Sequence, residues 1–142
     1  MAKASASSVV GGSVEEVWKV VGDFGGISNW HPAIAASAIV EGAGDAAGSI
    51  RECTLGDEGK LREEQLERSD ANHSYTYNIT EAPMPIENYI GKIQLSAAEG
   101  NKTLVEWTST FDVAADAEKE MVGMMNGVYQ AGLDDLTSKF GG

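Results

Sequence analysis

The chain has 142 residues, a length that fits one domain with a core large enough to need no disulfide or metal. Its 22 acidic and 10 basic residues leave a formal charge of −12, which repels nucleic-acid phosphates and anionic lipid surfaces. The single cysteine, Cys53, has no partner for an internal disulfide, and no Cys/His cluster has metal-site spacing. We therefore expect no metal, no cofactor and no nucleic-acid partner. No signal peptide or bilayer-spanning segment is recognised, so we expect a cytoplasmic monomer or homodimer without membrane insertion.

The first 32 residues predict one strand and two short helices. Residues 3–10 predict a strand, which ends at the following Gly-Gly pair. Ser13 followed three residues later by Glu16 forms a capping-box pattern, and apolar residues at helical spacing follow it. A second short helical piece ends before Pro32, because proline disfavours a helical conformation in the residue before it.

From residue 35 the apolar pattern changes to a period of two, which is typical of strands. The separators are short enough for hairpins, so the segments predict an antiparallel meander. With the N-terminal strand they make a sheet of about seven strands. The six segments are 35–42, 49–55, 60–68, 73–81, 87–97 and 103–113.

The last part of the chain, from about Asp116 to Phe140, predicts a long amphipathic helix. About 23 helical residues extend roughly 34 Å, which is enough to cross a whole sheet. Gly123, Gly127 and Gly132 interrupt the good helix formers. We expect them either to let the helix approach the sheet closely or to leave room for a bound molecule.

The two faces of the predicted sheet differ sharply, because residues two apart on a strand share a face. One face is polar throughout, and the other is mostly aromatic and aliphatic. The apolar face carries two charged exceptions, Arg51 and Glu64. Registers estimated from the turns place Arg51 opposite Glu64, Glu64 opposite Tyr77 and Ile93 opposite Trp107. Because an isolated buried charge is costly, we expect Arg51 and Glu64 to pair on the concave face.

An apolar face with a few fixed polar groups is the usual composition of a small-molecule site. The residues that we expect to contact such a ligand are Trp30, Arg51, Glu64, Tyr75, Tyr77, Tyr89, Trp107, Met121, Met125 and Tyr129.

Each of these residues also has a structural interpretation, and the sequence leaves both open. Arg51 and Glu64 either bind a ligand, or take part in catalysis with Glu64 as an acid/base, or form an ion pair that fixes strand register. His31 either moves a proton at the pocket mouth or, beside Trp30, caps a loop. The tyrosine hydroxyls either orient a polar group or stabilise the core. Trp107 and the methionines either line a pocket or fill the core.

Several short motifs occur in the following order along the chain: Val17-Trp18 with Asp23-Phe24, Trp30-His31-Pro32, Gly48 followed by Arg51, Glu64-x-Leu66, Tyr75-x-Tyr77, Thr103-x-Val105-x-Trp107, and Tyr129 followed by Gly132-Leu133 and Leu136. Together they resemble the motifs of the START-like (SRPBCC) superfamily, which has the helix-grip fold of the birch-pollen allergen. The resemblance covers nearly the whole chain and is strongest to the bacterial polyketide cyclase/dehydrase branch. It implies a single α+β domain, residues 1–142, with a cavity between the curved sheet and the long helix.

Three functional hypotheses follow. The first is that the protein binds a small hydrophobic or aromatic molecule, of the lipid, hormone or polyketide type that the resemblance implies. The second is a polyketide cyclase, dehydratase or lyase, in which Glu64, His31 and a tyrosine transfer protons and Arg51 stabilises an enolate. The third is an accessory protein whose exposed loops near Met84 or Trp30 contact another protein. The resemblance implies no shared set of catalytic residues that distinguishes among them.

Overall fold

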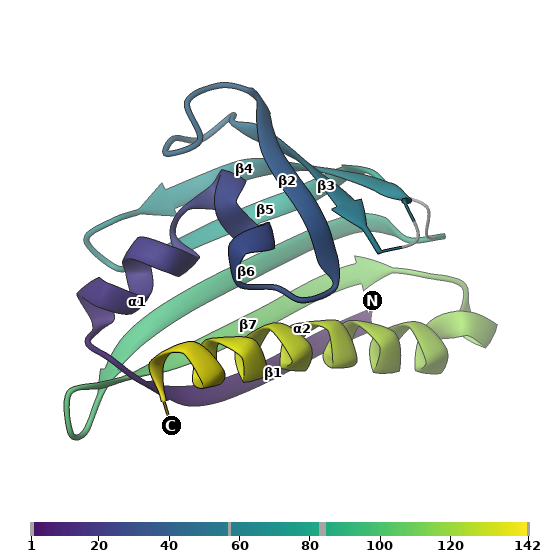
Figure 1. Cartoon of the computed structure of the whole chain (residues 1–142). Helices are drawn as coiled ribbons and strands as arrows, with labels where there is room; N and C mark the ends of the chain where they lie inside the picture. The colour runs from purple at the N-terminus through teal and green to yellow at the C-terminus, as the bar shows by residue number, and fades with distance from the viewer. Residues whose placement is uncertain (1, 57, 83–84, 142) are drawn as a thin grey trace.

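A seven-stranded antiparallel sheet curves around a long C-terminal helix, as the sequence predicts (Figure 1). The computed structural model describes residues 2–56, 58–82 and 85–141. In Figure 1 the helix α2 runs along strands β7 and β1, and the two short helices lie between β1 and β2 in the chain. The elements are β1 Ala2–Gly11, α1 Val14–Val21, η1 Phe24–Asn29, β2 Ile34–Glu41, β3 Ile50–Leu55, β4 Lys60–Ser69, β5 Ser74–Glu81, β6 Glu87–Ala98, β7 Lys102–Asp112, η2 Ala115–Ala117 and α2 Glu118–Phe140.

The strand order is β1-β7-β6-β5-β4-β3-β2, and all neighbours are antiparallel. Strands β2 to β7 form the predicted meander, and β1 joins it beside β7. Helix α2 packs beside β1, where the Ser5 backbone N–H donates to Asn126 Oδ1 over 2.8 Å. Edge strand β1 is therefore tied to the helix as well as to the sheet.

The predicted capping box at the start of α1 is confirmed. The Glu16 backbone N–H donates to Ser13 Oγ over 3.2 Å, and the Ser13 backbone N–H donates to Glu16 Oε1 over 3.3 Å. These bonds satisfy N–H groups that a helix N-terminus otherwise leaves without partners. The sequence signal therefore locates the first helix correctly.

The predicted alternation is also confirmed in β6 and β7. Ile93 lies opposite Trp107, as expected, and Leu95 lies opposite Val105. All four side chains are buried on the concave face. Because a slip of one residue would send this apolar set to the other face, the register of these strands is strongly specified.

The predicted register of β3 and β4 is wrong by one residue. Arg51 lies opposite Glu63, whereas Glu64 lies opposite Ile50. Glu63 is buried on the concave face, and the neighbouring Glu64 is half-buried on the other face, where its backbone N–H donates to Asn78 Oδ1. Tyr77 consequently faces Gln65, not Glu64. The predicted Arg51–Glu64 pair does not form.

The error has a physical cause, because two of the three buried side chains of β4 are polar. Leu61, Glu63 and Gln65 point inward, and a register shift between Gln65 and Glu67 changes the alternation after them. The Gln65 side-chain amide donates to the carbonyl oxygens of Gly44 and Ala46, each over 3.0 Å. A buried polar side chain is tolerated when its hydrogen bonds are satisfied. An assignment from polarity alone therefore turns the wrong face of β4 toward the core.

Of the three glycines in α2, one allows a close approach. A Cβ atom added at Gly132 would lie 2.8 Å from His31 Cδ2, 2.9 Å from Trp30 Cζ3 and 3.1 Å from Trp107 Cζ3. A Cβ added at Gly123 or Gly127 would meet nothing within 4 Å. Gly132 therefore lets α2 approach Trp107 of the sheet and the loop with Trp30 and His31 closely, as expected.

Cys53 lies on the concave face of β3 and is completely buried. Burial raises the pKa of its thiol to about 12. Because the thiolate is the reactive form, the folded protein holds this cysteine in an inert state.

Among the described residues, no helix combines the length and the apolar character that crossing a membrane requires. Within the described residues, no group of three or more His, Cys, Asp or Glu side chains is placed to hold a metal ion.

Candidate ligand-binding cavity

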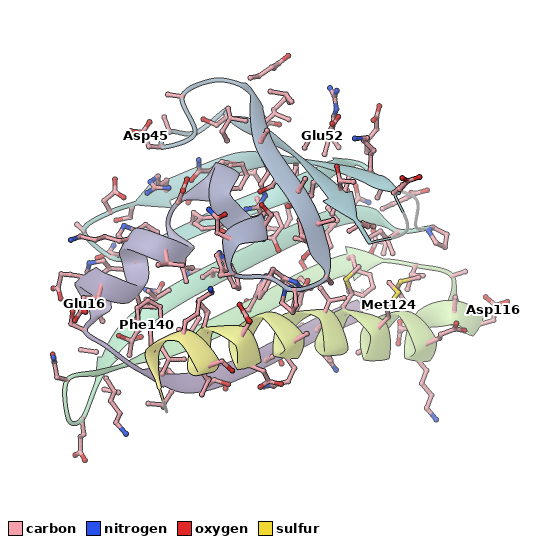
Figure 2. The ribbon with its side chains drawn as sticks, in the orientation of Figure 1. Glu16, Asp45, Glu52, Asp116, Met124 and Phe140 are labelled. Carbon is pink, nitrogen blue, oxygen red and sulfur yellow. The ribbon has the colours of Figure 1, made fainter. Side chains whose placement is uncertain are left out.

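A cavity of about 490 Å³ lies between the concave face of the sheet and α2. Met124 of α2, labelled in Figure 2, lines the cavity and is 41% exposed, so it lies at the mouth of the cavity. The half-buried Leu55, Ile79 and Val128 also border the mouth. The cavity is lined by Ile27, His31, Ala33, Ile34, Arg51, Leu55, Gly56, Leu61, Glu63, Tyr77, Ile79, Tyr89, Trp107, Met124, Met125, Val128 and Tyr129.

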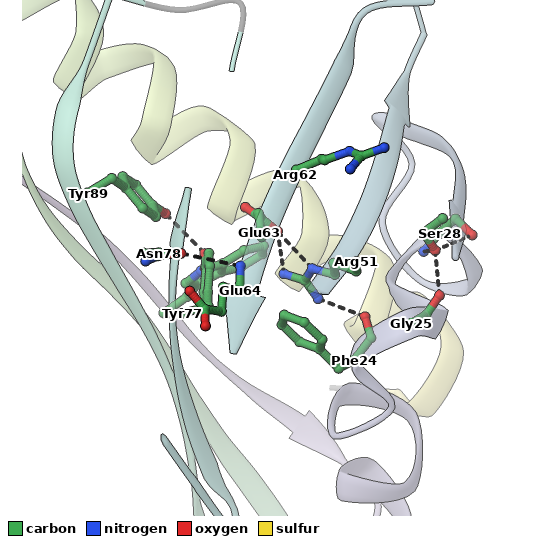
Figure 3. A network of polar contacts seen from close by, with 12 residues as sticks. Phe24, Gly25, Ser28, Arg51, Arg62, Glu63, Glu64, Tyr77, Asn78 and Tyr89 are labelled. Carbon is green, nitrogen blue, oxygen red and sulfur yellow. Dashed lines mark hydrogen bonds and ion pairs between the residues drawn. The ribbon is translucent and has the colours of Figure 1, made fainter. Parts of the chain in front are cut away.

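A buried ion pair between β3 and β4 forms one polar part of the wall (Figure 3). Arg51 Nε donates to Glu63 Oε1 over 2.7 Å, and Nη2 lies 2.7 Å from the same oxygen. Arg51 Nη1 donates to the Phe24 carbonyl over 2.9 Å, and the guanidinium carbon lies 4.0 Å from the centre of the Phe24 ring. The pair thereby joins two strands to η1.

The charges of this pair compensate each other. Arg51 is 0% exposed and Glu63 is 5% exposed. Burial alone would lower the pKa of Arg51, but Glu63 holds it above its ordinary value, so the guanidinium stays charged. A buried charge with a hydrogen-bonded partner avoids the cost of an isolated one.

A chain of hydrogen bonds links three tyrosines across β5, β6 and α2. Trp107 Nε1 donates to the Tyr77 hydroxyl over 2.8 Å, and the hydroxyls of Tyr77 and Tyr89 lie 3.0 Å apart (Figure 3). The Tyr89 hydroxyl also bonds to that of Tyr129. Tyr129 donates to Ser109 Oγ over 2.7 Å. We call these five residues the hydroxyl chain.

The hydroxyl chain remains protonated at neutral pH. Burial raises the pKa of Tyr77 and of Tyr89 well above the ordinary value, and it raises the pKa of Tyr129 to about 12. A glycine makes room for the chain, because a Cβ at Gly91 would lie 2.4 Å from Tyr77 Cζ.

His31 ties the loop before β2 to the middle of α2. Its Nε2–H donates to the Val128 carbonyl over 2.8 Å, and its Nδ1 accepts the Ala33 backbone N–H over 3.1 Å. Burial lowers the pKa of His31, and the bond to Val128 offsets this effect only in part. Both nitrogens of the neutral ring are thus occupied by backbone groups, which favours the structural interpretation of this residue.

Lowering the pH from about 7.5 to about 5 is expected to reduce the free energy of unfolding, partly through His31. The folded-state pKa of His31 lies below the ordinary value of 6.5, so the unfolded chain binds more protons between these two values. Stability from His31 is therefore complete above about pH 6.5 and is lost as the pH falls through the folded-state pKa. Urea unfolding at several pH values should show a weaker pH dependence for His31→Gln.

His73→Asn is the control for this measurement, because His73 lies in the turn before β5 and does not line the cavity. It should keep the wild-type pH dependence. Identical pH profiles for the wild type and His31→Gln would contradict the expectation.

The structure brings most of the predicted site residues together. Arg51, Tyr77, Tyr89, Trp107, Met125, Tyr129 and His31 line the cavity. Trp30, Tyr75 and Met121 are buried in the core without lining it. Glu64 faces the opposite side of the sheet, so the structure does not bring it near His31.

Two polar groups at or beside the cavity were missed from the sequence. Glu63 has the same parity as the buried Leu61, a signal that the polar residues of β4 obscured. Ser109 shares the apolar parity of β7, but its link to Tyr129 joins positions far apart in the chain. Near Trp30, the indole itself is 1% exposed, whereas Pro32 and Ala33 beside it are exposed, so a loop there that contacts another protein stays a prediction. Met84, the other position in that hypothesis, lies outside the described residues.

Comparisons with known proteins show similarity in fold and sequence over nearly the whole chain. A family model described as "Polyketide cyclase / dehydrase and lipid transport" matches residues 1–141. The structure of the protein XoxI from Bacillus cereus shares 31% identity, covering 99% of this chain and 96% of that one, with a TM-score of 0.91. An uncharacterised protein from Bacillus thuringiensis shares 33% identity over 98% of each chain, with a TM-score of 0.89.

A protein from Thermobifida fusca shares 28% identity over 99% of this chain and 94% of its own, with a TM-score of 0.91. A comparison with curated proteins found no match. The family model covers nearly the whole chain, and the similar structures share both the fold and part of the sequence. The chain therefore belongs to the polyketide cyclase/dehydrase and lipid transport family.

Proposed function

We propose that this protein binds a small, largely apolar molecule in the cavity between the sheet and α2. The observation that carries the proposal is the cavity itself, about 490 Å³ with mainly apolar walls, an ion pair and a hydroxyl chain. Its volume lies in the range of small-molecule sites, and a few fixed polar groups among apolar ones are typical of them. The family description, which includes lipid transport, supports the same class of ligand.

The mouth of the cavity suits an apolar ligand. Met124 is exposed there, and Leu55, Ile79 and Val128 are partly exposed. An unbranched thioether side chain adapts to different shapes at low cost, so Met124 can pack against a bound molecule.

Binding is favoured over the enzymatic alternative by the positions of the polar groups. Glu64 faces away from the cavity, and both nitrogens of His31 are occupied by backbone groups. Among the described lining residues, Glu63 is the one that carries a carboxylate, and its Oε1 already accepts a hydrogen bond from Arg51. These residues do not form the proton-transfer arrangement that the cyclase or dehydratase hypothesis requires.

The apolar fluorescent probe N-phenyl-1-naphthylamine tests the proposal. Titration should give saturable binding with an increase in fluorescence, because the probe leaves water for an apolar site. Val128→Trp places a large side chain in the cavity and should weaken the affinity by about tenfold or more. Fluorescence titration measures both effects.

Val40→Trp provides the matched control, because Val40 is 41% exposed on β2 and does not line the cavity. It should bind the probe like the wild type. Absence of saturable binding, or equal binding by Val128→Trp and the wild type, would contradict a ligand cavity.

A further inference from the structure

The hydrogen atoms of the hydroxyl chain can be assigned from one end. Tyr129 uses its single hydroxyl hydrogen to donate to Ser109 Oγ. The bond between Tyr89 and Tyr129 must then use the hydrogen of Tyr89. By the same reasoning, Tyr77 donates to Tyr89, while Trp107 Nε1–H donates to Tyr77. The direction of the whole chain is therefore fixed.

This direction leaves no phenolic hydrogen of the three lining tyrosines for a ligand. Tyr77, Tyr89 and Tyr129 line the cavity, and each has its hydrogen in a bond within the protein. What these three groups offer to a bound molecule is their oxygen atoms as acceptors. Burial raises the pKa of all three, so they do not become phenolates near neutral pH.

The other polar side chains of the wall are also poor donors to a ligand. Arg51 directs Nε at Glu63 and Nη1 at the Phe24 carbonyl. Its Nη2 makes no hydrogen bond of its own, but it lies 2.7 Å from Glu63 Oε1 and is buried, so a ligand does not reach it. His31 gives its Nε2–H to Val128. The Glu63 side chain lines the cavity and is 7% exposed, and an ionised carboxylate only accepts.

We propose that the ligand is held at its polar end by a neutral hydroxyl group, of a phenol or an alcohol, which donates to the hydroxyl chain or to Glu63. This inference rests on the proposed binding function and adds the chemical class of the ligand. A carboxylate would bring acceptors to a wall whose accessible polar side-chain atoms are themselves acceptors, and it would add a second negative charge beside Glu63. An ammonium group would add a positive charge where Arg51 and Glu63 already balance. Either charge would be buried without compensation, which is costly.

Three probes of one shape test this inference by isothermal titration calorimetry near neutral pH, where the phenol is neutral and the acid is ionised. They are 2-naphthol, 2-naphthoate and naphthalene. We expect 2-naphthol to bind about tenfold or more tightly than 2-naphthoate, and more tightly than naphthalene.

Ser109→Ala tests the role of the hydroxyl chain. Removing Ser109 Oγ frees the hydrogen of Tyr129, so the wall gains a donor. The preference for 2-naphthol over 2-naphthoate should then fall several-fold. Ser7→Ala makes the same change at an exposed position of β1 and should keep the wild-type preference. Urea unfolding of both variants establishes that the folded state persists.

The outcomes separate this inference from the binding function. Equal or tighter binding of 2-naphthoate, blocked by Val128→Trp, would overturn the hydroxyl anchor and leave the cavity function intact. Binding of N-phenyl-1-naphthylamine without binding of 2-naphthol would also overturn it, as would an unchanged preference in folded Ser109→Ala. Failure of N-phenyl-1-naphthylamine and all three naphthalene probes to bind would contradict the cavity function itself.

Discussion

Glu63→Gln is expected to lower the free energy of unfolding by about 3–5 kcal/mol, the usual effect of removing one partner of a buried ion pair. Arg51 is completely buried, so the variant leaves its charge without a counter-charge. Glu64→Gln is the matched control one residue along β4. Because Glu64 is half-buried and makes no described ion pair, its loss should be less than about 1 kcal/mol. Urea unfolding measures both.

A double variant separates the cost of an unpaired charge from the loss of packing. Arg51→Met with Glu63→Met removes both charges and keeps side-chain volume, so it should be clearly more stable than Glu63→Gln. A loss in Glu64→Gln as large as that in Glu63→Gln would contradict the register in which Arg51 faces Glu63.

Gly132→Ala is expected to destabilise the protein by about 1–3 kcal/mol, the usual effect of overpacking. The added methyl group would lie within 3.1 Å of three rings, those of His31, Trp30 and Trp107. These rings are buried against one another and cannot move aside freely. The steric cost should therefore exceed the helix propensity that alanine adds. Thermal or urea unfolding measures the change.

Gly127→Ala, in the same helix, is expected to change stability in the opposite direction. A methyl group at Gly127 meets nothing within 4 Å, so the variant gains helix propensity and should be more stable by up to about 1 kcal/mol. If both glycine variants changed stability in the same direction, the close approach of α2 to the Trp30–His31 loop would not hold.

Local signals predicted the fold well because they act over short distances. The capping box of Ser13 and Glu16 and the strand alternation around Trp107 depend on neighbouring residues, and both are confirmed. The concave positions of Tyr75 and Tyr77 follow from the same alternation. Most of the apolar wall was therefore predictable from side-chain periodicity.

The polar part of the site was less predictable because it depends on distant contacts. Which of Glu63 and Glu64 meets Arg51 is decided by a shift of one residue in a hairpin, and both choices give a carboxylate. The partners of Tyr129 lie on β6 and β7, at sequence separations of 40 and 20 residues. Sequence parity places these side chains on a face, but it does not give the distances between their oxygen atoms.

The buried Cys53 provides the protein with an internal reporter of β3 opening. The thiol is completely buried on the concave face of β3 and is protonated. A thiol reagent such as Ellman's reagent therefore reacts only with molecules in which this region has locally unfolded. Because the chain contains a single cysteine, the labelling rate describes one position. A ligand that fills the adjacent space slows this labelling to the extent that it holds the strands closed, so occupancy can be followed without any chromophore on the ligand.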